Sequence, residues 1–176
     1  TKLGIDRTTG GRAVVSGHIL GLRNDIFAAN EHGPSFLYQN FDGRFVDRAV
    51  EYGVDDSRQN GRGTALADIL YDGRLGLIIG NWNGYHRAYV PTRHSFLDYA
   101  TEAFREPSLV RTVISADFDN DGFDEIFFNN IGQPNRMFRV RDGGVLEPVA
   151  LSAALEADGL GTGAAVADID GDGVLD

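Results

Sequence analysis

The sequence has no cysteine among its 176 residues, and its 16 lysines and arginines are outnumbered by 26 aspartates and glutamates. Without cysteine the chain holds no disulfide framework, no thiolate metal site and no cysteine nucleophile. The formal net charge of −10 disfavours nucleic acid and anionic membranes as partners, because their phosphates would repel the chain. No apolar run approaches the roughly 20 residues of a membrane span, and no basic stretch followed by an apolar one marks a signal peptide.

Hydrophobic residues make up 42% of the chain, which is enough to build a core, and the length suits one ordinary domain. General disorder is therefore not expected. The sequence stops within a motif at residues 172–176, so we expect a piece of a longer chain.

An internal repeat of about 50 residues organises the chain. Asp68, Asp117 and Asp168 each end an apolar run, at spacings of 49 and 51 residues. Residues 61–68, Gly-Arg-Gly-Thr-Ala-Leu-Ala-Asp, match residues 161–168, Gly-Thr-Gly-Ala-Ala-Val-Ala-Asp. The chain is thus predicted to consist of equivalent structural units.

Each period contains short apolar or alternating runs bounded by Asp-Gly and Asn-Gly, the pattern of antiparallel strands joined by tight turns. Four strands in about 50 residues is the size of one propeller blade. We predict an all-β fold, a β-propeller of four-stranded blades, with one helical turn near residues 99–105. Its strands in the first and third blades are expected at 13–15, 26–29, 36–39, 45–48, 114–116, 125–129, 136–140 and 145–149. One partial propeller domain over residues 1–176 would hold about three and a half blades, at 11–60, 61–110, 111–160 and, as the first strand and loop of a fourth, 161–176.

Two loops, at residues 117–125 and 168–176, share the pattern D-x-D-x-D-G-x-x-[DE]. Carboxylates at positions 1, 3 and 5 converge because the glycine at position 6 permits a sharp turn. A bound Ca²⁺ offsets the repulsion between these carboxylates, and the backbone carbonyl of position 7 is a further ligand. Magnesium usually keeps several waters, and zinc lacks its cysteine and histidine ligands here. The alternative is a solvated Asp/Gly-rich turn. We predict two calcium sites, with the ligands Asp117, Asp119, Asp121, Phe123 (carbonyl) and Glu125, and Asp168, Asp170, Asp172, Val174 (carbonyl) and Asp176.

An EF-hand begins with similar residues but needs a glutamate at position 12 and a helix on each side. Position 12 counted from Asp117 is Phe128, which lies in a strand-like run. The EF-hand interpretation therefore fails.

The equivalent loops of the first two repeats have lost most of their carboxylates. In the second repeat only Asp68 and Asp72 remain, and Arg74 offers a salt bridge in place of a cation. In the first repeat, residues 17–25, only Asp25 remains, and we expect packing alone to hold this loop.

The run Gly-x-Gly-x-Ala-Val-Ala-Asp-x-Asp-x-Asp-Gly at residues 161–173 resembles the calcium-binding repeat of the FG-GAP/VCBS class, which is found in integrin alpha subunits and secreted bacterial proteins. Asn129-Asn130, Phe-Leu-Tyr-Gln-Asn at 36–40 and Asp-Gly-x-Phe-x-Asp at 42–47 are similar to the cartilage acidic protein and UnbV-like branch. The resemblance implies a seven-bladed propeller with the acidic loop between the first two strands of a blade. Three and a half blades cannot close such a ring, so we expect a longer chain or pairing with another copy.

Motifs of the common enzyme classes are missing. Neither Gly-x-Ser-x-Gly nor a P-loop occurs, and the Gly-x-Gly pairs lack the third glycine of a dinucleotide site. The four histidines, at 18, 32, 86 and 94, show no ligand spacing and are expected at the surface or at blade edges. Trp82 is expected to pack, with partner binding as its alternative role.

We interpret the chain as a non-enzymatic, calcium-binding propeller module for protein or carbohydrate binding and adhesion. Extracellular modules bind calcium at about 10⁻⁴–10⁻³ M, so the expected location is extracellular, periplasmic or at the cell surface. The alternative is the propeller part of a secreted or biosynthetic enzyme, such as a lyase or dehydratase, with catalysis outside this segment. A purely structural spacer is the third possibility, since fold alone does not decide function.

Overall fold

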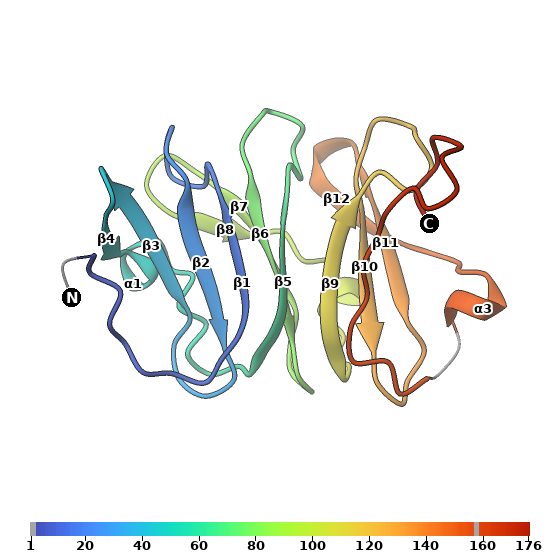
Figure 1. Cartoon of the computed structure of the whole chain (residues 1–176), viewed down its shortest axis with the longest axis horizontal. Helices are drawn as coiled ribbons and strands as arrows, with labels where there is room; N and C mark the ends of the chain where they lie inside the picture. Colours follow the sequence, from blue (N-terminus) through green and yellow to red (C-terminus); the bar gives the residue numbers. More distant parts are fainter. Residues whose placement is uncertain (1–2, 157–158) are drawn as a thin grey trace.

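The computed structural model describes residues 3–156 and 159–176, and within these ranges twelve strands form three four-stranded antiparallel sheets (Figure 1). In every sheet the spatial order of the strands follows the order of the sequence. The prediction of an all-β fold with four-stranded blades is confirmed. The strands are β1 Gly11–Gly17, β2 Asp25–Asn30, β3 Phe36–Phe41 and β4 Arg44–Asp47; β5 Gly61–Ala67, β6 Gly76–Asn81, β7 Arg87–Pro91 and β8 Phe96–Asp98; β9 Val110–Ala116, β10 Glu125–Asn130, β11 Arg136–Arg141 and β12 Val145–Val149.

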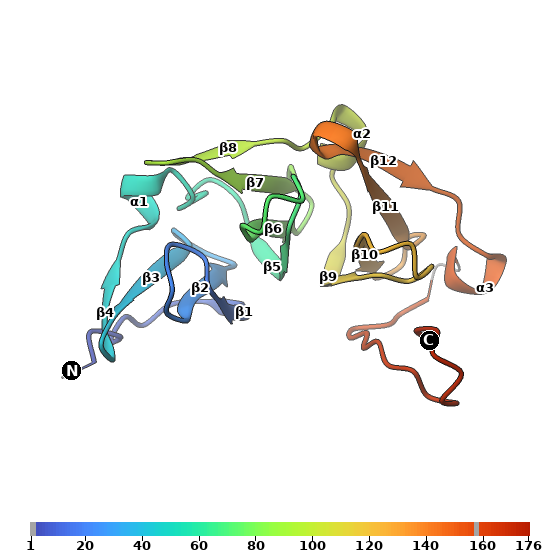
Figure 2. The same ribbon diagram turned by 90° about the horizontal axis from the view of Figure 1, so that it is seen from above.

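The three sheets stand side by side along an arc, as the blades of a partial propeller do (Figure 2). The first strands β1, β5 and β9 line the concave side of the arc, and β5 contacts both of the other two. Strands β4, β8 and β12 lie on the outside. The assignment of all 176 residues to one domain stays a prediction.

The helices of the described ranges are single turns: α1 Ala49–Tyr52, α2 Glu102–Arg105, α3 Ala153–Glu156 and a 3₁₀ turn at Asp142–Gly144. Helix α2 begins where the hydroxyl of Thr101 accepts a hydrogen bond from the backbone N–H of Phe104, at 3.3 Å. The predicted helical turn near residues 99–105 is thereby confirmed. None of the helices in the described part of the chain is long and apolar enough to cross a membrane.

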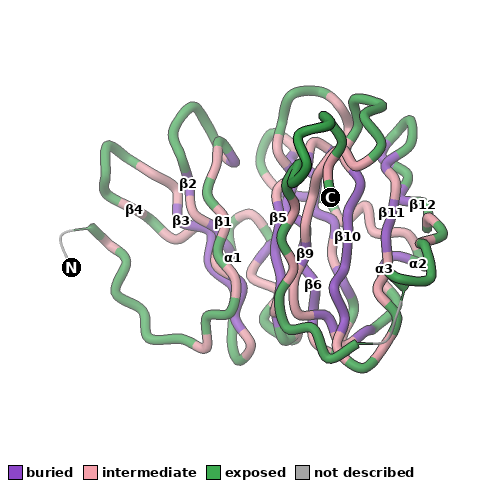
Figure 3. Tube along the Cα trace, turned by 45° about the vertical axis from the view of Figure 1, so that its right-hand side comes forward, coloured by how far each residue is buried: buried purple, intermediate pink, exposed green. Residues whose placement is uncertain are grey.

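Apolar side chains fill the spaces between neighbouring sheets. Phe104, Phe128 and Phe138 are fully buried between the second and third sheets, with ring centroids 4.8–5.7 Å apart. Glycines let the two sheets approach, since a Cβ on Gly80 would lie 2.7 Å from Cγ2 of Val113. The buried strands β5, β6 and β10 therefore form the rigid interior from which the exposed loops project (Figure 3).

The predicted first strand of a fourth blade, at residues 161–167, is not formed. In each complete blade the first strand pairs with the second, whereas no strand among the described residues pairs with residues 161–167. A single pair remains, in which the N–H of Asp176 donates to the carbonyl of Ala167 at 2.9 Å. The segment rests on the third sheet through Asn129, whose Nδ2 donates to the Gly161 carbonyl at 3.2 Å.

Candidate metal centres

The four repeated loops lie at the same end of the structure, at the top in Figure 1. Three of them join the first and second strands of their sheets, and the fourth follows residue 167. The repeat therefore brings equivalent loop positions to one face of the arc.

Hydrogen bonds to Asp117 shape the loop at residues 117–125. Its carboxylate accepts from the backbone N–H groups of Asp121, at 3.1 Å, and Gly122, at 2.9 Å. Positive φ angles of 57° at Asn120 and 90° at Gly122 make this turn possible, and asparagine and glycine adopt such angles most readily. The sequence pattern thus folds the chain around its first carboxylate.

Asp117, Asp119 and Glu125 each place one carboxylate oxygen within 4.8 Å of the others. Asp121 is outside this group, and its carboxylate accepts from the N–H of Phe123 at 2.9 Å. The Phe123 carbonyl as a ligand stays a prediction. Glu125 is only 1% exposed, and its Oε2 accepts from the N–H of Phe118 at 3.1 Å. A buried carboxylate therefore stands beneath two more exposed ones.

The loop at residues 168–176 repeats this arrangement in a more exposed position. Asp168 accepts from Asp172 and Gly173 at 3.1 and 3.0 Å, and Asp176 accepts from the N–H of Ile169 at 2.9 Å. Oxygens of Asp168, Asp170 and Asp176 converge within 4.8 Å. Asp172 lies outside the group, and its carboxylate accepts from the N–H of Val174 at 2.8 Å. The Val174 carbonyl as a ligand stays a prediction.

Neighbouring loops touch one another. The amide Nδ2 of Asn120 donates to the carbonyl of Gly173 at 2.9 Å, which joins the two acidic loops. On the other side the ring of Phe123 packs edge-on against Tyr71, with centroids 4.2 Å apart. Burial, and secondarily the nearby Asp124 and Asp121, raise the pKa of Tyr71 to about 12, so this phenol stays neutral. The loops of the second, third and fourth repeats are therefore connected by direct contacts.

The second loop keeps the same turn, although Leu70 and Gly76 stand where the acidic loops have carboxylates at positions 3 and 9. Asp68 accepts from Asp72 and Gly73 at 3.1 and 2.7 Å, and Arg74 forms the predicted salt bridge to Asp72. The hydrogen bond from Arg74 lowers the pKa of Asp72. Neither residue belongs to a group of convergent ligands among the described residues.

The first loop corrects an expectation, because packing alone does not hold it. Asp25 is 2% exposed, and its carboxylate accepts from the N–H of Leu20, at 2.7 Å, and of Asn40, at 2.8 Å. Asp25, at the ninth position of this loop, is therefore a structural hydrogen-bond acceptor, although the loop lacks the other carboxylates of the pattern.

A buried histidine is the polar site that the sequence did not reveal. His18, His32 and His94 are exposed as expected, but His86 is fully buried. Its Nδ1 accepts from the backbone N–H of Asn81 at 3.0 Å, so Nε2 carries the proton and donates to Ser108 Oγ, also at 3.0 Å. Only the asparagine that recurs at Asn30, Asn81 and Asn130 hinted at this network.

The His86–Ser108 pair resembles a general base and a nucleophile, but the histidine donates a proton to the serine in this hydrogen bond and does not accept one. Ser108 Oγ donates onward to Oδ1 of Asn130 at 2.8 Å, while Nε2 is already protonated and cannot accept the serine proton. Burial, with a smaller contribution from Arg136, lowers the pKa of His86 to about 3. The network is therefore a structural one.

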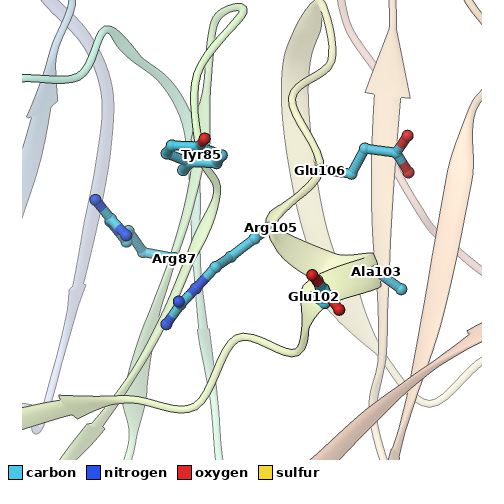
Figure 4. A pocket seen from close by; sticks show the side chains of 6 residues that line it. All are labelled: Tyr85, Arg87, Glu102, Ala103, Arg105 and Glu106. Atoms are coloured by element: carbon cyan, nitrogen blue, oxygen red, sulfur yellow. The ribbon is translucent and has the colours of Figure 1, made fainter.

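A hollow on the outer side of the second sheet brings charges of both signs together (Figure 4). Two of its arginines, Arg87 and Arg105, pair with Asp98 at 3.2 and 2.9 Å, whereas Glu106 turns away from them. No histidine among the described residues lines it. Its arginines already have carboxylate partners, so the hollow lacks the convergent cluster that a catalytic centre would need.

Comparisons with known proteins agree with the resemblance seen in the sequence. The FG-GAP-like repeat matches residues 117–176. Over 189 aligned residues, which include 99% of this chain, it is 51% identical to cartilage acidic protein 1 of Homo sapiens and 49% identical to those of Xenopus tropicalis and Mus musculus. The chain spans 29% of the length of these relatives.

Proposed function

We propose that this chain, which carries FG-GAP-like repeats, is a calcium-stabilised propeller module that binds a protein or carbohydrate partner outside the cytoplasm. The observation that carries the proposal is the recurrence of one carboxylate arrangement in two loops, each with three oxygens converging within 4.8 Å. A solvated turn without a ligand would not be expected to repeat the same carboxylate arrangement at the equivalent position of the next repeat.

The donor chemistry fits calcium. Calcium accepts six to eight oxygen ligands at about 2.3–2.6 Å, so oxygens on opposite sides of the ion lie up to about 5 Å apart. The convergent oxygens of both loops are within that span. Asp117, Asp119 and Glu125 would hold one ion and Asp168, Asp170 and Asp176 the other, with Asp121, Asp172 and the carbonyls of Phe123 and Val174 as the remaining predicted ligands.

The ions would supply structural stability. The loop at residues 117–125 carries five carboxylates and the loop at residues 168–176 carries four, and their mutual repulsion opposes the turn in the absence of a cation. Glu125 begins β10 and Asp117 directly follows β9, so an ion between them would tie the first two strands of the blade together. Exposed sites of this kind suit the high calcium concentration outside cells, which supports an extracellular location.

Thermal unfolding tests the proposal. We expect calcium to raise Tm relative to a chelator, because an ion that binds only the folded state stabilises it by mass action, and magnesium to raise it less. Asp117→Asn and Asp168→Asn should each reduce the calcium-dependent shift. Asp142→Asn, an exposed change of the same kind outside the acidic loops, is the control. Equal responses to calcium and magnesium, or no response, would contradict calcium binding.

A further inference from the structure

Three arginines occupy the same place in successive blades. Arg12, Arg62 and Arg111 follow one another at spacings of 50 and 49 residues, near the starts of β1, β5 and β9. The fourth repeat has Thr162 at this position.

Each of these arginines is the extra residue of a β-bulge. Gly11 pairs with Asn30 and Ala13 with Ala29, which leaves Arg12 without a partner in the ladder. The same shift leaves out Arg62, between Gly61 and Gly63, and Arg111, between Val110 and Thr112. A bulge turns its extra side chain out of the regular alternation, and bulges often redirect side chains at binding sites.

Arg12, Arg62 and Arg111 lie at the opposite end of the first strands from the repeated loops. The repeated loops follow the last residues of β1, β5 and β9, whereas the arginines are the second residues of these strands. The three strands line the concave side of the arc (Figure 2). These three arginines therefore lie away from the two acidic loops, although other arginines, such as Arg74 and Arg139, stand at the loop end.

Side chains from the ends of the second strands alternate with the arginines. Glu31 follows β2 and forms ion pairs with both Arg12 and Arg62. Trp82 follows β6 and lies between the guanidinium carbons of Arg62 and Arg111, 5.0 and 4.5 Å from its ring centroid. We call these five residues, Arg12, Glu31, Arg62, Trp82 and Arg111, the arginine row.

The arginine row has more positive charge than it can neutralise. Its one carboxylate, that of Glu31, pairs with two of the three guanidinium groups, and among the described residues Arg111 has no ion pair. The Nε atoms of Arg62 and Arg111 are buried without a hydrogen-bond acceptor in the described structure. In a chain of net charge −10, this excess of donors is the part of the surface suited to an anion.

We propose that the arginine row binds the carboxylates of an acidic peptide segment on a protein partner. Glu31 already shows the recognition geometry, a carboxylate held by two guanidinium groups, and the planar fork of Arg111 can hold another. The partly buried ring of Trp82 adds an apolar surface beside the charges. This inference deepens the binding role proposed above, but it uses the end of the molecule without the calcium loops, so either proposal can fail alone.

Binding of a fluorescent, end-capped hexaglutamate peptide to the 176-residue chain tests the proposal, with hexaglutamine as the uncharged probe. We expect the hexaglutamate to bind with an affinity that falls as salt is raised. Arg111→Gln should weaken it roughly tenfold, the loss expected for one charge-assisted contact, and Arg12→Gln should weaken it less, because Arg12 already pairs with Glu31. Arg111→Lys, which keeps the charge without the fork, should show an intermediate loss.

Arg23→Gln is the matched control, because Arg23 is 53% exposed and Arg12 50% exposed, and each pairs with one carboxylate. Calcium in all samples keeps the acidic loops loaded, and bridging of the peptide through calcium would not respond to Arg12 or Arg111. Absence of hexaglutamate binding, or equal losses in the control, would show that the arginine row only joins the blades. Tighter binding of a sulfated polysaccharide, with the same dependence on the arginines, would overturn the peptide assignment.

Discussion

Arg139 on β11 lies directly opposite Glu125 on β10, and its Nε donates to Oε1 of that buried carboxylate at 3.0 Å. The same guanidinium group forms an ion pair with Asp119. A side-chain cation thus pairs with two of the three carboxylates that converge in this loop. In the described part of the chain no arginine pairs with the acidic loop at residues 168–176, so the two candidate sites differ in their built-in counter-charge.

Arg139→Gln should make the loop at residues 117–125 more dependent on calcium. Removal of the positive charge takes away the partner of Glu125 and Asp119, so Tm in a chelator should fall by a few degrees. Calcium should then bind this loop more tightly, because it no longer competes with a guanidinium group. Melting curves with and without calcium measure both effects.

Arg141→Gln is the control for that variant, since Arg141 is on the same strand and pairs with the exposed Glu147. A change of equal size in the control, or a calcium affinity lowered by Arg139→Gln, would contradict the competition between Arg139 and the ion.

Asp25→Ala should destabilise the chain by roughly 2–3 kcal/mol, whether or not calcium is present. The substitution leaves the N–H groups of Leu20 and Asn40 without their acceptor in a buried place, and unsatisfied buried donors cost about 1–3 kcal/mol each. Denaturant unfolding measures the loss. Glu147→Ala breaks an exposed ion pair with Arg141 and should cost less than about 1 kcal/mol.

His86 should make the chain less stable in mild acid. Its folded-state pKa of about 3 is below the unfolded value near 6.5, so the unfolded chain binds the proton first and stability falls as pH drops from 6.5 towards 3. The expected loss at pH 5 is about 2 kcal/mol. Unfolding in chelator at pH 7 and pH 5 measures it, and His86→Gln should show a smaller pH dependence. An unchanged pH dependence in the variant would mean that His86 is charged or accessible in the folded chain.

Gly80→Ala should test how closely the second and third sheets approach. The new methyl group would lie 2.7 Å from Cγ2 of Val113 and 3.0 Å from both γ carbons of Val110, and overpacking of this kind costs about 1–3 kcal/mol. Gly21→Ala, where nothing lies within 4 Å, should have little effect. Val113→Ala in the Gly80→Ala background should recover part of the loss. Equal unfolding free energies for the two alanine variants would refute the close packing.

The sequence predicted the blades because Asp-Gly and Asn-Gly turns separate apolar runs at a constant period. It also placed the acidic loops, since the spacing of their carboxylates and glycines determines the turn. The structural role of Asp25 was not predicted, because the number of carboxylates in a loop does not reveal whether one of them is buried. His86 was expected at the surface or at a blade edge, since neither its burial nor its contact with Ser108, 22 residues away, follows from local pattern.

Two further features depend on tertiary structure. The segment at residues 161–167 matches residues 61–67 closely but is not a strand, because a strand needs a neighbour to complete its hydrogen bonds. The recurrence of arginine at 12, 62 and 111 is visible in the sequence. The bulges that turn these arginines to one side are visible only in the pairing of the strands.

Isothermal titration of the metal-free chain with calcium tests the central claim most directly. The account predicts two bound ions per chain, and one each for Asp117→Asn and Asp168→Asn, with Asp142→Asn unchanged at two. Absence of binding heat, or two ions retained when either acidic loop is altered, would contradict it.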